Sequence, residues 1–286
     1  MSKKTPYIYL TPWLIGLVVF KIYPMIETIV YSFTDYSLMN NPQFVGLENY
    51  TTLFQNPKFM ISLTATLKYV ILTVPFALMF GLFIAFILNF KIKGVGLFRT
   101  VYYIPSLLGG SVAVAVLWQT LFLYDGPINN FLQVFGVEPI GWFSDPNAAI
   151  ISLSLLRLWQ FGSMMLIFLA ALQGVPEELY EAAQIEGASK LYIFKRVTIP
   201  IISPVILFNG VMALIGAFQE FTAPFIITNG GPEYHTYFLN MYIYEEAFTY
   251  YNFGYACALS LILVLIILAV TVVVFALSKN NVFYSD

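Results

Sequence analysis

Six long and almost uninterrupted apolar stretches constrain this chain more than any other feature of its sequence. A helix of about 20 apolar residues crosses the hydrocarbon core of a bilayer, which is about 30 Å thick. Only helices and closed barrels satisfy all their backbone hydrogen bonds in that core. Each stretch is long enough to cross as a helix; together they cover approximately residues 7–33, 60–90, 101–124, 148–173, 201–228 and 253–277.

The composition agrees with a chain embedded in a lipid bilayer. Hydrophobic residues make up 59% of the chain and charged residues only 10%, whereas about a quarter of the residues of a soluble domain are charged. We therefore expect an all-α membrane protein of about six transmembrane helices, with residues 1–286 forming a single transmembrane domain.

The basic residues between the stretches predict the orientation of the chain in the membrane. Lysine and arginine concentrate in cytoplasmic loops, and here all loop cations except Lys58 fall on one side. That side also carries both termini, so we expect a multi-pass protein of the plasma membrane whose N- and C-termini are cytoplasmic. The basic residues on this side are Lys3, Lys4, Lys91, Lys93, Arg99, Lys190, Lys195, Arg196 and Lys279.

Several functional classes lack the residues that they need. The lone Cys257 and the lone His235 exclude a disulfide and a cysteine–histidine metal cluster. No phosphate-binding loop and no catalytic serine motif is found, so we expect neither ATP hydrolysis nor other catalysis by this chain, and no cofactor or metal bound to it. The sequence has no basic tract interleaved with aromatic residues, so nucleic-acid binding is not expected. A secondary transporter stays open as an alternative, although neither midplane carboxylates nor repeat symmetry is evident.

Five ionisable residues lie inside the apolar stretches, where a charge needs a partner or a water-filled cavity. Lys21, Glu27, Lys68, Arg157 and Glu220 all lie in the outer half or near the midplane of the predicted spans. Lys68 and Glu27 are equally compatible with side chains that reach the outer headgroups. Arg157 and Glu220 have similar depth on consecutive spans, so we expect them to pair or to line a common hydrated pathway.

Aromatic and amide side chains surround these two charges. Sugars stack their C–H faces on aromatic rings, and their hydroxyls exchange hydrogen bonds with amides and donate them to carboxylates. Such groups are equally common in ordinary helix packing, which stays open for each of them. The candidate pathway residues are Arg157, Trp159, Gln160, Ser163, Phe218, Gln219, Glu220 and Phe221.

A polar, helix-prone segment separates the fourth and fifth stretches, and its predicted position is cytoplasmic. Glu181-Ala182-Ala183 is followed after three residues by Gly187, and after nine more by Val197-Thr198-Ile199-Pro200. This spacing resembles the E-A-A motif of the permease subunits of binding-protein-dependent ABC importers. Glu186 and Ala188 match the carbohydrate group of these importers, except that Glu186 stands where aspartate is usual.

Three further elements carry the same resemblance over nearly the whole chain. Residues 125–129 look like an outer-loop Gly-x-x-Asn element of sugar permeases, and residues 169–176 resemble the lead into the E-A-A motif. Residues 228–232 look like the T-x-G-G-P of the subunit type represented by the MalF and UgpA permeases.

The resemblance implies a type I ABC importer permease fold in a bacterial inner membrane. Its core would cover about residues 60–278, with a cytoplasmic coupling loop over about 174–199. The implied partners are a homologous second permease in a heterodimer, two ATPase subunits that hold ATP and magnesium, and an extracytoplasmic solute-binding protein. The residues that the resemblance implies to contact the ATPase are Glu181, Ala182, Ala183, Glu186, Gly187 and Ala188.

The implied solute is a sugar or oligosaccharide. A solute such as glycerol phosphate stays an alternative, because the cationic Arg157 and Lys68 are suited to face a phosphate.

Overall fold

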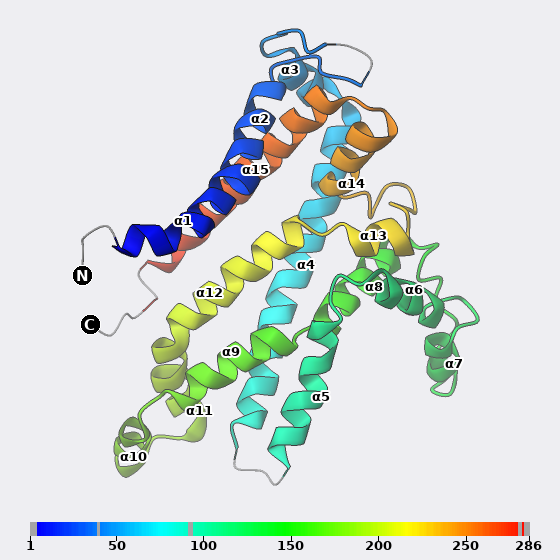
Figure 1. Cartoon of the computed structure of the whole chain (residues 1–286). Helices are drawn as coiled ribbons and strands as arrows, with labels where there is room; N and C mark the ends of the chain where they lie inside the picture. The colour runs from blue at the N-terminus through cyan, green and yellow to red at the C-terminus, as the bar shows by residue number, and fades with distance from the viewer. Residues whose placement is uncertain (1–4, 39–40, 91–93, 280–281, 283–286) are drawn as a thin grey trace. The chain divides into compact units, whose positions relative to one another are not determined.

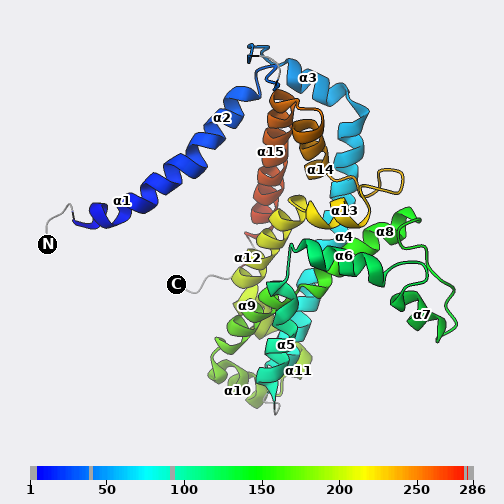
Figure 2. The ribbon, with the colours of Figure 1, turned by 45° about the vertical axis from the view of Figure 1, so that its right-hand side comes forward.

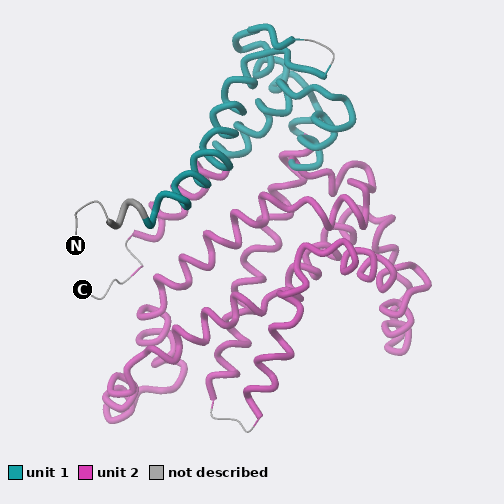
Figure 3. Tube along the Cα trace, in the orientation of Figure 1, with its two compact units in different colours: residues 1–60, 240–266 teal, residues 61–239, 267–286 magenta. Residues whose placement is uncertain are grey.

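A computed structural model of the chain describes residues 5–38, 41–90, 94–279 and 282. It divides into two compact units, one formed by residues 1–60 and 240–266 and the other by residues 61–239 and 267–286 (Figure 3). We call them unit 1 and unit 2. Four of the basic residues used above to predict orientation, Lys3, Lys4, Lys91 and Lys93, lie outside the described residues.

Helices form almost all of the regular structure in the part of the chain that is described (Figure 1). In its first half they are α1 (Thr5–Leu17), η1 (Val18–Ile22), α2 (Tyr23–Tyr31), α3 (Glu48–Gln55), α4 (Pro57–Leu88), α5 (Val95–Leu107), α6 (Val112–Leu121) and α7 (Pro127–Gln133). In its second half they are α8 (Pro146–Trp159), α9 (Gly162–Gln173), α10 (Glu177–Ile185), α11 (Lys190–Ile193), η2 (Phe194–Thr198), α12 (Ile199–Phe218), α13 (Thr222–Ile227), α14 (Leu239–Tyr244), η3 (Glu245–Thr249) and α15 (Phe253–Ser278). The η segments are π-helical turns.

The number of candidate membrane spans is compatible with the six predicted from the sequence, but two of the spans are bent. Among the described residues, 4 helices are long and apolar enough to cross a membrane, and the number reaches 6 if each of two bent helix pairs forms one span. The third and fourth expected spans are these bent pairs. Helices α5 and α6 meet at 103°, and helices α8 and α9 meet at 48°. Each of these two stretches, expected as one span, consists of two helices joined at a bend.

Local chemistry explains the sharper bend. Pro105 has no N–H to donate and lies in the last turn of α5. Gly110 then adopts φ +72°, a left-handed conformation that other residues rarely adopt. Ser111 has extended backbone and occupies the N-cap position of α6, without a capping hydrogen bond from its side chain. Hydropathy averaged over the stretch does not detect this turn.

The fifth span begins earlier than expected. Residues 190–227 form one candidate span, in which α11, η2 and α12 run into one another without a loop. The predicted loop over 174–199 therefore ends at Ser189, whose side chain caps α11 by accepting a hydrogen bond from the backbone N–H of Tyr192. At its other end the helix is interrupted at Gln219–Phe221, before α13.

Four long helices of unit 2, α4, α5, α9 and α12, lie side by side (Figure 1 and Figure 2). Their shared core includes Phe161, Met165, Phe168 and Leu172, which recur every three or four residues on one side of α9. Lipid tails are as apolar as these side chains, so close packing stabilises such an interface more than the hydrophobic effect does. Consistent with this, Gly162 lets the backbones of α5 and α9 approach closely.

Unit 1 is held together by polar contacts. Lys58 forms an ion pair with Glu245 at 3.0 Å, and its ammonium lies 5.6 Å from the ring centroids of Tyr242 and Tyr250. The hydrogen bond that Tyr250 donates to Glu245 raises the pKa of Tyr250, because ionisation would place a phenolate beside a carboxylate. Burial raises the pKa of Tyr242. Both phenols therefore stay protonated donors at neutral pH.

The turn after α13 is tied by threonine side chains within unit 2. The hydroxyls of Thr228 and Thr236 are 2.6 Å apart, and Thr236 donates a hydrogen bond to the carbonyl oxygen of Gly231 at 2.7 Å. Asn229 and Gly230 adopt positive φ values of 47° and 82°, which asparagine and glycine tolerate best. The T-x-G-G-P element thus specifies a defined turn.

The Gly-x-x-Asn element organises the loop between α6 and α8. Asn129 is fully buried, and its amide N–H groups donate to the carbonyl oxygens of Tyr124 at 2.9 Å and Ile140 at 2.8 Å. Its amide oxygen accepts from the backbone N–H of Ile140 and from Trp142 Nε1. A Cβ at Gly126 would lie 2.7 Å from a carbonyl oxygen. Both positions of the element therefore have a structural role.

We expect Asn129→Ala to lower the free energy of unfolding by about 3 kcal/mol, because it leaves several buried backbone groups unpaired. Chymotrypsin cleavage between residues 124 and 142 should accelerate in parallel. The matched control is Asn130→Ala, whose exposed side chain makes one hydrogen bond at 3.4 Å. Equal stability of the two variants would contradict the assigned role of Asn129.

Candidate functional site

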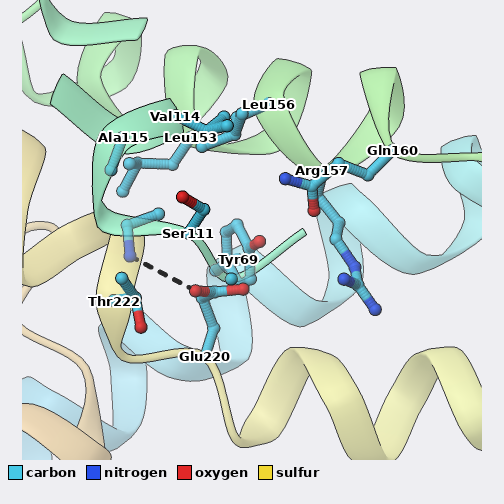
Figure 4. A pocket seen from close by; sticks show the side chains of 12 residues that line it. Tyr69, Ser111, Val114, Ala115, Leu153, Leu156, Arg157, Gln160, Glu220 and Thr222 are labelled. Atoms are coloured by element: carbon cyan, nitrogen blue, oxygen red, sulfur yellow. Dashed lines mark hydrogen bonds between the residues drawn. The ribbon is translucent and has the colours of Figure 1, made fainter. Parts of the chain in front are cut away.

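Two adjoining cavities open in unit 2 where the bent helix pairs meet α4 and α12. The larger has a volume of about 340 Å³ and the smaller of about 80 Å³. Arg157 and Gln160 line both cavities. Ser163 lines the larger one, and Glu220 lines the smaller one together with Tyr69 (Figure 4). Four of the eight predicted pathway residues are therefore brought together around one space.

The helix breaks create this space. Gln160 ends α8, and its amide oxygen would lie 3.6 Å from a Cβ at Gly109, in the break between α5 and α6. A Cβ at Gly216 would lie 3.1 Å from a guanidinium nitrogen of Arg157. Arg157 therefore reaches a point of α12 where a side chain larger than glycine would displace it.

Arg157 and Glu220 do not form an ion pair in this structure. Glu220 instead accepts a hydrogen bond from the backbone N–H of Ala223 at 3.4 Å, at the start of α13. The Arg157 side chain extends away from the Glu220 carboxylate (Figure 4). The sequence predicted that Arg157 and Glu220 either pair or line a common space. In the structure both line the smaller cavity, and they do not pair.

The other intramembrane charges lie away from the two cavities. Lys68 is exposed on α4, and Glu27 accepts a hydrogen bond from the hydroxyl of Tyr23, one helical turn earlier. Lys21 is also exposed. None of the three lines either cavity.

The remaining predicted pathway residues lie outside the lining of both cavities. Trp159 packs on Trp118, with ring centroids 5.9 Å apart. Phe218 is only 1% exposed, Gln219 is exposed at the end of α12, and Phe221 stacks on Phe225. Their contribution to a pathway stays a prediction.

Asn209 was missed by the sequence analysis. It lies on α12, is only 3% exposed and lines the larger cavity. Its amide nitrogen has no hydrogen-bond partner among the described residues. A buried unpaired amide costs about 1–3 kcal/mol, so it indicates a site for an absent partner. The available signal was one amide within a long apolar stretch of the fifth predicted span.

The segment with the E-A-A spacing forms an exposed helix at one end of unit 2 (Figure 1 and Figure 2). Helix α10 has no buried residue, and Ile185 is 87% exposed. Ala183 and Ala188 are half-buried, and the other four predicted contact residues are exposed. Its acidic first turn, Glu177 and Glu178, complements the positive end of the helix dipole.

Gly187 ends this helix as expected. Its φ of +78° allows the backbone N–H of Ala188 to donate to the carbonyl oxygen of Ala183 at 3.0 Å, and its own N–H to donate to Gln184. This is a Schellman C-cap, for which glycine is the favoured residue. No atom lies within 4 Å of a Cβ built at Gly187, so its requirement is conformational and not steric.

The exposed helix is connected to the cavity through one continuous element. The hydroxyls of Tyr180 on α10 and Thr198 on η2 are 3.2 Å apart. From Lys190 the helix continues through η2 into α12 and reaches Asn209 after 19 residues, about 29 Å at 1.5 Å per residue. Helix α10 is therefore linked by one contact and by a continuous helix to a wall of the larger cavity.

Comparisons with known proteins agree with this architecture. The profile of a family described as "binding-protein-dependent transport system inner membrane component" matches residues 66–281. The chain is 41% identical to the probable ABC transporter permease protein YesP of Bacillus subtilis, over 97% of this chain and 91% of that protein. It is 34% identical to the lactose transport system permease protein LacF of Rhizobium radiobacter, over 87% and 86% of the two chains.

The fold matches a chain of a solved bacterial ABC transporter involved in the import of the acidic polysaccharide alginate. The TM-score is 0.83, the sequence identity is 23%, and the match covers 96% of this chain and 94% of the other. At this identity the likeness shows the fold alone.

We expect Gly162→Ala to destabilise the protein by about 3 kcal/mol, because overpacking at a rigid contact strains the backbone. The added Cβ would lie 2.4 Å from the carbonyl oxygen of Tyr102 on α5. Gly81→Ala is the matched control, since its Cβ would meet only the flexible side chain of Met164, at 3.3 Å. Thermal unfolding of the purified variants measures the difference. If Gly162→Ala lowered the stability no more than Gly81→Ala does, the close approach of α5 and α9 at Gly162 would be refuted.

Proposed function

Since this chain belongs to the family of binding-protein-dependent transport system inner membrane components, we propose that it forms half of the translocation pore of an ATP-driven importer for a sugar or oligosaccharide. The observation that carries this proposal is the exposed helix α10, whose E-A-A spacing ends at the left-handed Gly187 and leads directly into the helix that lines the cavity. A secondary transporter needs no such helix.

The cavity supports a hydroxylated solute. Arg157, Gln160, Ser163 and the unpaired amide of Asn209 present donors and acceptors around a space of about 340 Å³. Such volumes are at the lower end of those that hold small molecules, about 300–1,000 Å³. The 34% identity to a lactose permease supports a sugar over a phosphate ester.

We assign ATP hydrolysis to a separate ATPase with its ATP and magnesium, so this chain binds no cofactor. A homologous second permease completes the pore in a heterodimer. Two ATPase subunits and an extracytoplasmic solute-binding protein complete the complex. Solved relatives of the same fold include an alginate transporter in complex with a pentasaccharide-bound periplasmic protein.

The orientation follows from the same assignment. We place α10 and both termini in the cytoplasm of a bacterial cell, which is the side where the ATPase binds. Lys190, Lys195, Arg196 and Lys279 then lie inside, as the positive-inside rule requires.

In the mechanism, α10 sits in a groove of the ATPase, where Ala182 allows close approach and Glu181 and Glu186 offer charges. ATP closes the ATPase dimer and displaces α10. Because Tyr180 contacts Thr198 and α11 continues into α12, the displacement reaches Asn209 and Ala217. The cavity then opens to the binding protein, and hydrolysis returns it to the inward-facing state.

The direct test is uptake of a panel of labelled sugars, lactose and maltotriose included, into proteoliposomes that hold the complex purified through this chain. We expect ATP-dependent uptake that also requires the solute-binding protein. Uptake driven by an ion gradient without ATP would establish the secondary transporter instead.

We expect Gly187→Val or Glu181→Lys to reduce ATP-driven uptake at least tenfold and to weaken ATPase retention during purification. Valine at a φ of +78° costs about 1–2 kcal/mol and distorts the cap. Gly94→Val is the matched control, because Gly94 also has a positive φ, +80°, and open space around it. Normal uptake by the Gly187 and Glu181 variants would refute the coupling role.

We expect Asn209→Leu to lower sugar uptake at least tenfold while raising the melting temperature. Leucine has a similar volume and removes a buried unpaired amide, which stabilises by about 1 kcal/mol or more. If the amide had a purely structural role, its replacement would instead lower the melting temperature of the protein. Unchanged uptake would remove Asn209 from the solute site.

A further inference from the structure

An apolar groove of about 550 Å³ lies on unit 2 away from the two cavities. One wall is the last part of α4 together with Phe90, which follows it; the α4 residues are Met79, Leu82, Phe83 and Phe86. Met79 and Phe83 are each 58% exposed and Phe90 is 54% exposed, whereas Leu82 and Phe86 are half-buried. The stripe is therefore open at both ends and in its middle.

The other wall is the start of the helix that leads to the cavity. Leu191 and Phe194 complete the apolar lining, and the rings of Phe86 and Phe194 meet edge to face, with centroids 4.9 Å apart. Lys190 is the one charged residue of the lining, and it is exposed. The groove is thus an apolar slot with a single cation in its wall.

The dimensions match half a bilayer. Met79 and Leu88, the last residue of α4, are nine residues apart, about 14 Å along the helix. Half of a hydrocarbon core of about 30 Å is about 15 Å. The groove ends at Phe90, two residues after the end of α4, where a span meets the headgroup region. Its length is therefore that of one acyl chain in one leaflet.

We propose that this groove binds an anionic phospholipid, with an acyl chain along the α4 stripe and the headgroup phosphate at Lys190. Basic residues beside spans on the cytoplasmic side recognise anionic headgroups, and the orientation proposed above places Lys190 on that side. Because Lys190 starts the helix that leads to the cavity, three residues after Gly187, the lipid contacts the coupling segment and α4 at once. The inference holds whichever solute is transported.

The test uses the full chain in nanodiscs of phosphatidylcholine that contain a fraction of brominated lipid. Phe83→Trp places a fluorescent reporter in the groove, and the signal of the 4 native tryptophans is subtracted with the parent chain. We expect brominated phosphatidylglycerol to quench this reporter roughly fivefold more effectively than brominated phosphatidylcholine, the ratio expected for one lysine beside an anionic headgroup.

Three variants make the result specific. Ile71→Trp, at a position of α4 that is 71% exposed and outside the groove, should show no preference between the two lipids. Lys190→Gln should abolish the preference at residue 83, and Lys195→Gln, an exposed lysine outside the groove lining, should retain it. If Phe83→Trp does not fold, Met79→Trp serves as the reporter.

Equal quenching by both lipids at residue 83 would mean ordinary annular lipid and would overturn the proposal. Quenching by neither would mean that protein covers the groove, and would overturn it as well. A preference that survives Lys190→Gln would refute the assigned headgroup contact.

Discussion

Inside a membrane every backbone N–H and C=O must find a partner within the protein, and the form of this chain depends on that requirement. Each place where a helix stops inside a predicted span needs a substitute partner. At the end of α13, the amide of Gln119 on α6 donates to the carbonyl oxygen of Ile227 at 2.9 Å. Within α8, the carbonyl oxygen of Ser152 accepts a hydrogen bond from the indole of Trp118 on α6, at 3.0 Å. These side-chain bonds tie α6 to α13 and to α8 in the region of the helix breaks.

That region is also where the cavities lie. The breaks at Gly109–Gly110, Gln160–Phe161 and Gln219–Phe221 bring side chains from the ends of helices together, as intact helices would not. Unit 2 thereby combines two properties in one set of helices. Away from the breaks, α4, α9 and α12 share a packed core, whereas at the breaks residues at the ends of helices line the two cavities. The continuous helix formed by α11, η2 and α12 runs from the end of α10 through the packed region to the breaks. It therefore connects the exposed helix with the cavities.

The sequence predicted the spans, the exposed helix and its glycine cap, because each has a local signature. Long apolar runs predict spans whatever they pack against, and Gly187 ends α10 through a left-handed conformation that glycine adopts more readily than other residues. The bends were not predicted, since Gly162 acts through its contact with Tyr102, a residue 60 positions earlier. The positions of Arg157 and Glu220 in their predicted spans indicated a similar depth in the membrane. They could not show in which direction each side chain points. Asn209 was missed because a single amide in an apolar helix forms no pattern.

Asn209 also shows why stability and function oppose each other in this cavity. Within the described chain, buried polar groups elsewhere are mostly paired; Asn129, for instance, is bonded through both its amide nitrogen and its oxygen. The amide nitrogen of Asn209 lacks a partner although an apolar residue would fit the same helix. A group that costs about 1–3 kcal/mol when unpaired is disfavoured by folding alone. Under the proposed function its presence on the cavity wall has an explanation, because a solute hydroxyl would supply the missing partner.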